Sequence, residues 1–307
     1  MSDPRRPDDD DPSRMTRREF NELALAAGVA VAIGPAVATA QAATVEKDVE
    51  VKTPDGTCDA VLVRPDGEGR WPGVILFPDA FGLRPTMRAM ARRLAADGYV
   101  VLAINPFYRA TRAPGTGPDF NFADPAARAK LDALRAVLTN DAVARDAHAF
   151  VTYLDAQPFV NTSAPVGAFG YCMGGLMTLQ AAAGEPSRIG AGASFHGGGL
   201  VTDKPGSPHL LVPKMKGRYL IAIAASDDAQ QPDAKTKLRE AFASAKLPAT
   251  VEVYEGTQHG WCVPDMPKRD GKPIYDEAEA ERAWKALTAL FGAALAQAAR
   301  RWPGASA

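Results

Sequence analysis

Apolar and polar positions alternate along most of the chain in patterns that predict strands and helices in turn. Residues 44–52 and 58–64 alternate apolar with polar side chains, as the two strands of an antiparallel edge hairpin do. Continuous apolar runs follow, and these are typical of strands that are buried on both faces of a sheet. The stretches that we expect to be strands after the hairpin are 73–77, 99–104, 164–169, 190–195, 218–225 and 249–254.

Stretches with helical periodicity separate these predicted strands. Met87, Met90 and Leu94 recur at helical spacing before Gly98, a residue type that commonly ends helices. The helices that we expect are 86–97, two helices within 124–155 that meet near Asn140, 176–183, and 276–300. Because strands alternate with helices, we predict an α/β fold: one domain over residues 43–307 with a mostly parallel, doubly wound sheet flanked by helices.

The first 42 residues have a different character and predict an export signal. The paired Arg17 and Arg18 precede a mildly apolar run over 23–38 and small residues up to Ala42 that suit cleavage. Together they indicate a twin-arginine signal and a periplasmic or secreted protein. An N-terminal membrane anchor is the alternative, but the run is shorter and less apolar than the roughly 20 residues that a spanning helix needs. We therefore expect no stable membrane insertion after cleavage.

The amino-acid composition says more about the possible binding partners of the protein than about its fold. The chain has 307 residues, 46% hydrophobic and 23% charged, with a net charge of −1, so it lacks the basic surface of a nucleic-acid-binding protein. We expect a monomer. Three cysteines are too few for a disulfide framework, although pairing of Cys58 with Cys262 stays open. No metal cluster or cofactor fingerprint appears, so neither is predicted.

The segment from Gly170 to Gly175, Gly-Tyr-Cys-Met-Gly-Gly, lies between a predicted strand and a predicted helix. Small residues around one reactive side chain at such a junction are typical of a nucleophile elbow, where a Cβ at the glycine positions would clash. Cys172 is the nucleophile that this pattern predicts. The alternative is a buried cysteine at a glycine-rich turn, since free cysteine is often buried.

A cysteine nucleophile needs a histidine and an acid, in the chain order nucleophile, acid, histidine. His259 follows the last predicted strand and is the expected base, whereas His196 follows an earlier strand and could line the site. Asp227 and Asp228 both follow the strand over 218–225. We favour Asp228, because Pro232 four residues later would begin the next helix.

An oxyanion hole should combine two backbone N–H groups in this arrangement. One belongs to the residue after the nucleophile, Met173. The other comes from the loop after the strand over 73–77, where Ala80 is the candidate.

At these motifs the chain resembles the dienelactone hydrolases (carboxymethylenebutenolidases), a family with the α/β-hydrolase fold. The Cys172 elbow, the Asp79-Ala80-Phe81-Gly82 loop, and Tyr108 with the 113–116 loop carry the resemblance, which extends over nearly all of residues 43–307. The resemblance implies that Asp79, at a position where a member of the family has glutamate, helps to activate the thiol; the alternative is a turn-forming aspartate with no catalytic part.

The resemblance also implies substrate contacts, and here the chain departs from the family. The family binds a substrate carboxylate through arginines near the tyrosine and just after the histidine. Arg109 and Arg112 lie near the first position, beside Tyr108, but Trp261 and its neighbours supply no arginine at the second. Because charge-assisted pairs are strong, this departure weakens the expectation of a dienelactone substrate. Tyr108, Arg109, Arg112 and Trp261 are the candidate substrate-binding residues; for Arg109 and Arg112, surface ion pairs or solvated positions are the alternative.

Together these observations predict a hydrolase that cleaves a small-molecule lactone or activated ester through Cys172, Asp228 and His259 and an acyl-enzyme intermediate. A general carboxylesterase or thioesterase with the same triad is one alternative. A non-catalytic binding or thiol-redox protein on this scaffold is another.

Overall fold

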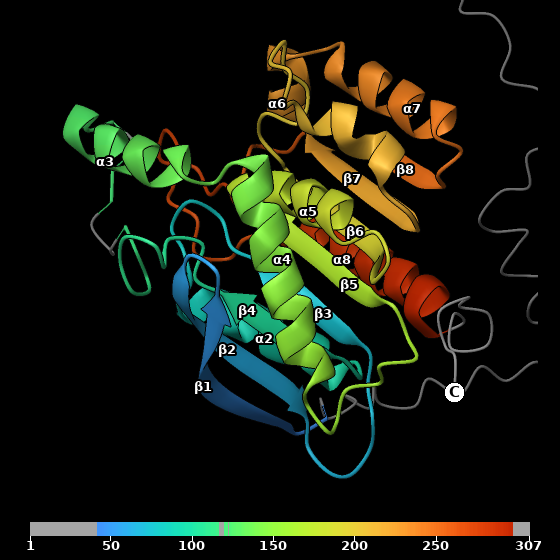
Figure 1. Ribbon diagram of the computed structural model, residues 1–307. Coiled ribbons are helices and arrows are strands. Elements are labelled where there is room, and N and C mark those ends of the chain that lie inside the picture. The colour runs from blue at the N-terminus through green and yellow to red at the C-terminus, as the bar shows by residue number, and fades with distance from the viewer. Residues whose placement is uncertain (1–41, 117–119, 122, 297–307) are drawn as a thin grey trace, which may run out of the picture. The chain divides into compact units, whose positions relative to one another are not determined.

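The computed structural model describes residues 42–116, 120–121 and 123–296. The expected export signal thus falls outside the described residues, apart from its last position. Within this part of the chain, eight strands form one sheet in the order β1-β2-β4-β3-β5-β6-β7-β8 (Figure 1). Their bounds are β1 Thr44–Thr53, β2 Gly56–Pro65, β3 Gly73–Phe77, β4 Val100–Ile104, β5 Val166–Tyr171, β6 Ile189–Phe195, β7 Arg218–Ala224 and β8 Ala249–Tyr254.

The sheet is mostly parallel, as predicted. β1 and β2 pair as an antiparallel hairpin, and β2 joins the sheet antiparallel to β4. From β4 to β8 every neighbouring pair is parallel. Every residue of β3, β4, β5 and β6 is buried, which explains why these strands appear in the sequence as continuous apolar runs.

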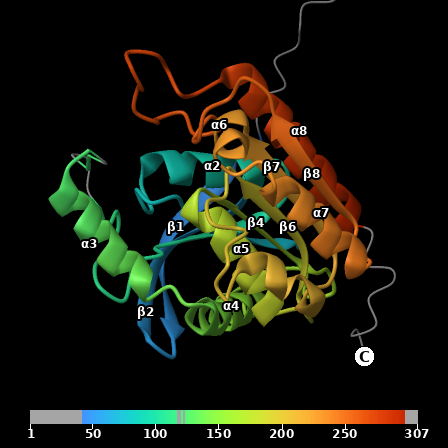
Figure 2. The ribbon, with the colours of Figure 1, turned by 90° about the horizontal axis from the view of Figure 1, so that it is seen from above.

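Helices cover both faces of the sheet. The helices are α2 Pro85–Ala96, α3 Pro125–Ala136, α4 Asn140–Asp155, α5 Met173–Gly184, α6 Ala225–Gln230, α7 Ala234–Ser244 and α8 Glu277–Phe291, with a 3₁₀ segment over Pro208–Lys214. In Figures 1 and 2, α4, α5 and α7 lie on one face, and α2 and α8 lie on the other. This two-faced cover is the arrangement that a doubly wound sheet requires.

The last described helix differs from its prediction. It begins where the carboxylate of Asp276 accepts a hydrogen bond from the Glu279 N–H, and it ends as an α-helix at Phe291. A π-helical turn over Gly292–Ala296 follows. Residues 297–300, the end of the predicted helix, lie outside the described residues.

The two remaining cysteines are free thiols in the core. Cys58 and Cys262 are both buried and unpaired, so the open possibility of a bridge between them is not realised. Among the described residues, no helix combines the length and the apolar character that crossing a membrane requires.

Candidate active site

Cys172 lies at a strained turn between β5 and α5. Its φ of 52° and ψ of −115° form a backbone conformation that is costly for a residue with a side chain. The flanking glycines make the turn possible. A Cβ at Gly170 would lie 2.2 Å from the Gly174 carbonyl oxygen, and one at Gly174 would lie 2.0 Å from the Phe77 carbonyl oxygen. The predicted elbow is therefore present, with the cysteine at the N-terminus of α5.

His259 lies in the loop after β8, and two contacts fix it. The Ser226 hydroxyl accepts a hydrogen bond from the His259 N–H at 2.9 Å, and the Asp227 carboxylate lies 2.8 Å from His259 Nδ1. Burial lowers the pKa of His259, but hydrogen bonds with Asp227 and Cys172 outweigh that effect and raise the pKa to about 10. The imidazole is thus positioned between a carboxylate and the thiol.

The acid beside His259 is Asp227, which corrects the prediction of Asp228. A short helix, α6, begins directly after β7 at Ala225, rather than near Pro232 as the sequence suggested. Successive helical residues point about 100° apart, so only one of two adjacent aspartates faces the histidine. The Asp228 carboxylate instead binds the Lys235 ammonium of α7 at 2.6 and 2.8 Å.

The loop expected to form the oxyanion hole passes along the start of α5. Its proximity is shown at Gly174, where a Cβ would approach the carbonyl oxygens of both Phe77 and Pro78. None of the backbone hydrogen bonds in the described turns and loops uses the N–H of Met173 or Ala80. Met173 and Ala80 stay the candidate donors of an oxyanion hole.

Asp79 does not contact the thiol in this structure. Its carboxylate is buried and forms a two-pronged ion pair with Arg84, at 2.7 and 3.0 Å. Arg84 also binds Asp265, in the loop after His259, at 2.7 Å. Burial raises the pKa of Asp79, and Arg84 opposes that rise. In this arrangement Asp79 ties the loop that carries Ala80 to the loop after the histidine.

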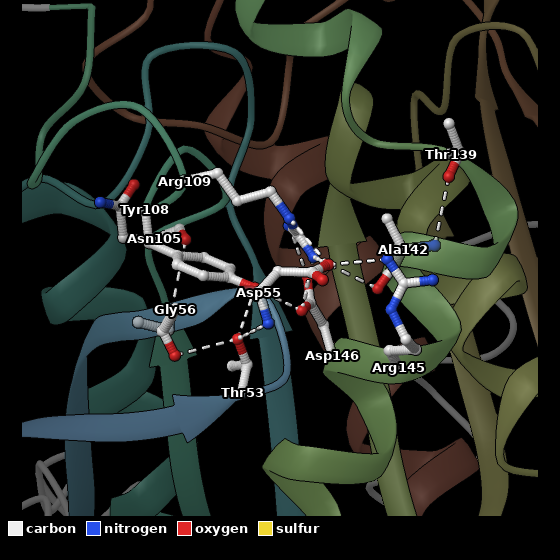
Figure 3. Close-up of polar contacts among 11 residues, drawn as sticks. Thr53, Asp55, Gly56, Asn105, Tyr108, Arg109, Thr139, Ala142, Arg145 and Asp146 are labelled. Atoms are coloured by element: carbon white, nitrogen blue, oxygen red, sulfur yellow. Dashed lines mark hydrogen bonds and ion pairs between the residues drawn. The ribbon is translucent and has the colours of Figure 1, made fainter.

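Tyr108 and Arg109 join a polar network between the β1–β2 hairpin and α4 (Figure 3). The Arg109 guanidinium binds both Asp55 and Asp146, and the Tyr108 hydroxyl donates to Asp146 at 2.6 Å and lies 2.7 Å from the Thr53 hydroxyl. Carboxylates thus already neutralise the Arg109 cation. The expectation that Arg109 binds substrate is not supported by this geometry.

Arg112 and Trp261 also differ from their expected roles. Arg112 is 72% exposed and pairs with Glu50. Trp261 is fully buried, with its ring 5.0 Å from that of Tyr254 and 5.3 Å from that of His196. Because Trp261 has no exposed surface, it packs behind the histidine loop and does not line a substrate cavity.

A cavity of about 390 Å³ opens beside the histidine and contains an arginine that the sequence reasoning missed. Asp227 and His259 line it, together with the glycines of the 197–199 segment and Arg269. Arg269 bonds to the Gln258 side chain, and within the described residues it has no carboxylate partner. Arg269 lies ten positions after His259, so the local sequence gives no signal of its place beside the histidine.

The described residues contain no cluster of three or more histidine, cysteine, aspartate or glutamate side chains that could hold a metal ion. The side chains that the structure links here are Cys172, His259 and Asp227. A nucleophile, a base and an orienting acid in this order can support acyl transfer.

Comparison with known proteins adds an independent line of support. Residues 58–295 match the family model of the dienelactone hydrolases. A carboxymethylenebutenolidase homologue from Synechocystis sp. is 27% identical over 234 residues, which cover 75% of this chain and 89% of the relative. The carboxymethylenebutenolidase of Pseudomonas sp. strain P51 is 34% identical over 116 residues, covering 38% of this chain and 46% of the relative.

Solved structures show the same architecture. A dienelactone hydrolase-like protein from Klebsiella pneumoniae superposes with a TM-score of 0.69 at 21% identity, covering 81% of this chain and 99% of that chain. The dienelactone hydrolase-like promiscuous phosphotriesterase P91, from metagenomic libraries, superposes with a TM-score of 0.68 at 25% identity, covering 82% of this chain and 99% of that chain.

Proposed function

Because this chain belongs to the dienelactone hydrolase family, we propose that it hydrolyses a lactone or an activated carboxylic ester with Cys172 as its nucleophile. The observation that carries the proposal is the geometry of three residues. Cys172 occupies the strained elbow, its side chain helps to raise the pKa of His259, and the Asp227 carboxylate lies 2.8 Å from His259 Nδ1. This is the nucleophile, base and acid arrangement of covalent acyl transfer.

The chemical steps follow from these positions. His259, with its pKa raised to about 10, already holds the proton that the thiol gives up, and the sulfur attacks the carbonyl carbon of the substrate. The N–H groups of Met173 and Ala80 stabilise the negative charge that develops on the carbonyl oxygen. His259 then gives its proton to the departing alkoxide, which leaves a thioester on Cys172.

Hydrolysis of the thioester completes the cycle. His259 removes a proton from a water molecule, which attacks the thioester carbon and regenerates the thiol. The Asp227 carboxylate holds the imidazole in one orientation throughout and stabilises its protonated form. Asp79 stays a candidate for thiol activation, although activation would require it to leave Arg84.

Hydrolysis of a chromogenic ester by wild type and by Cys172→Ala tests the proposal. We expect the variant to lose the activity while keeping the wild-type unfolding temperature. Equal rates in the two proteins would refute the proposal and favour a binding or thiol-redox role.

A general carboxylesterase or thioesterase activity is the second candidate, and the pairing of Arg109 and Arg112 favours it. Arg109 and Arg112, expected to bind a substrate carboxylate, are both paired with carboxylates of the protein. Comparing cis- and trans-dienelactone with neutral esters of similar size distinguishes the two candidates. A preference for neutral esters would support the broader esterase.

Export and the monomeric state are also proposals. Replacing both Arg17 and Arg18 with lysine should retain the protein in the cytoplasm if a twin-arginine signal directs it. Unchanged export of the double variant would contradict this. Size-exclusion chromatography with light scattering checks the expected monomer.

A further inference from the structure

His196 is a fully buried histidine at the end of β6, next to the elbow. Its φ of 40° is unusual for a residue with a side chain, and its N–H donates to the Ala222 carbonyl oxygen of β7 at 2.8 Å. The imidazole Nδ1 accepts a hydrogen bond from the Cys172 N–H at 3.1 Å. A side chain from one strand end thus holds the backbone of the nucleophile at the end of the next strand.

The same ring lies against the catalytic imidazole. The centroids of the His196 and His259 rings are 4.9 Å apart, with an edge-to-face angle of 66°. The ring centroids of Trp261 and Tyr171 lie 5.3 Å and 5.9 Å from that of His196, so aromatic rings surround the His196 imidazole. His196 therefore touches both members of the nucleophile–base pair.

These contacts require one protonation state. Because Nδ1 accepts a hydrogen bond, the proton of the neutral ring lies on Nε2. A doubly protonated ring would turn an N–H toward the Cys172 N–H and place a second positive charge beside His259. Burial lowers the pKa of His196 well below its ordinary value, and His259 lowers it further. His259 and Tyr171 are the titratable groups whose rings face it.

We propose that His196 is a positioning residue that holds the Cys172 backbone and the His259 ring in register for proton transfer. The Cys172 N–H also donates to the Phe195 carbonyl oxygen at 3.0 Å, so His196 supplies the second acceptor at a backbone position that is already strained. Losing that acceptor frees the elbow to relax, and the sulfur then moves relative to His259. This inference rests on the proposed cysteine nucleophile.

Two substitutions separate the hydrogen bond from packing. His196→Phe keeps a ring but has no acceptor, whereas the amide oxygen of His196→Asn can accept from the Cys172 N–H, and asparagine tolerates a positive φ. We expect His196→Phe to lower kcat about 10-fold or more with KM nearly unchanged, as the loss of one aligned hydrogen bond allows. His196→Asn should recover most of kcat.

A chemical readout reports on the thiol itself. The rate at which iodoacetamide modifies Cys172, located by peptide mass spectrometry, should fall in His196→Phe and recover in His196→Asn. A residue with only a structural role would lower the unfolding temperature without changing this rate. Wild-type values of kcat and modification rate in His196→Phe would overturn the proposal, and so would equal losses in both variants.

Nitrogen-15 NMR of wild-type imidazoles tests the proposal without a variant, in case His196→Phe does not fold. An Nδ1 without a proton and an Nε2 with one, between pH 6 and pH 9, is the expected signature. A proton on Nδ1 would overturn the proposal. Cys172→Ala distinguishes failure of the proposed function from failure of the positioning role. If Cys172→Ala retains ester hydrolysis, the proposed function fails. If Cys172→Ala is inactive but the His196 variants hydrolyse the ester at the wild-type rate, only the positioning role fails.

Discussion

Replacing one of two adjacent aspartates should lower the rate of hydrolysis strongly, and replacing the other should not. Asp227→Asn removes the charge that lies 2.8 Å from His259 Nδ1 but keeps the size of the side chain. Asp228→Asn makes the same chemical change one residue away, where the partner is Lys235. The pair of variants therefore tests orientation rather than composition.

The expected losses of kcat differ because Asp227 contacts His259, whereas Asp228 contacts Lys235. A hydrogen bond to a charged group contributes about 1.5–3 kcal/mol, so its loss at His259 should lower kcat by about 10- to 100-fold. The Asp227 and His259 side chains are only 22% and 27% exposed, which limits rescue by solvent. The Lys235 and Asp228 side chains are 29% and 19% exposed, so this pair is about as shielded as the first, and its loss should lower stability. Because Asp228 binds Lys235 and not His259, its loss should leave kcat unchanged.

Steady-state hydrolysis of a chromogenic ester measures both variants, and the pH dependence of kcat/KM, which reports the free enzyme, adds a second check. Because Asp227 helps to raise the pKa of His259, its loss should shift the basic limb of the profile to lower pH. If Asp228→Asn lost activity and Asp227→Asn kept it, the orientation of α6 and the assignment of the acid would both be refuted.

Three further predictions concern stability and substrate choice. Gly174→Ala should lower the unfolding free energy by more than about 3 kcal/mol, because its Cβ would lie 2.0 Å from the Phe77 carbonyl oxygen. Gly292→Ala meets no atom within 4 Å and should be neutral or slightly stabilising. Urea denaturation compares the two variants, and similar losses would contradict the packing argument. Arg269→Gln should lower kcat/KM for anionic esters about 10-fold and leave kcat/KM for neutral esters unchanged, since Arg269 lines the cavity and has no carboxylate partner in the described part of the chain. Equal effects on both kinds of ester would exclude binding of a substrate anion by Arg269. The pKa of His259 in the folded protein, about 10, lies above its ordinary value of 6.5. Protonation of His259 therefore stabilises the fold fully below pH ~6.5 and progressively less toward pH 10. The urea midpoint of wild type should fall across this pH window more than that of His259→Gln, and parallel curves would argue against the raised pKa.

The sequence could predict features that depend on short-range patterns. The buried strands stand out as apolar runs, and the glycines of the elbow are visible because the turn around Cys172 tolerates no Cβ at their positions. His259 was found through chain order alone. Each of these signals spans only a few residues or follows from the order of the elements.

Features that depend on direction or on distant partners could not be predicted. The choice between Asp227 and Asp228 turns on where α6 begins, and a shift of one helical residue changes the direction of a side chain by about 100°. Arg109 resembled a substrate contact, but its partners Asp55 and Asp146 lie 54 and 37 residues away in the chain. No local pattern reveals such pairings.

The contact between His196 and the Cys172 N–H also joins residues that are distant in the sequence. The two residues are 24 positions apart and meet because β5 and β6 are parallel neighbours whose ends coincide. The sequence placed His196 after a strand, but only the register of the sheet shows which backbone group its ring faces.

Trapping the acyl-enzyme tests the central claim most directly. Wild type is mixed with an excess of a slowly hydrolysed chromogenic ester, quenched in acid and digested, and the peptides are weighed by mass spectrometry. A burst of one product per enzyme, with the acyl group on the peptide that contains Cys172 and not on those containing Cys58 or Cys262, is the predicted result. Turnover without an adduct at Cys172, or an adduct at another residue, would contradict the account.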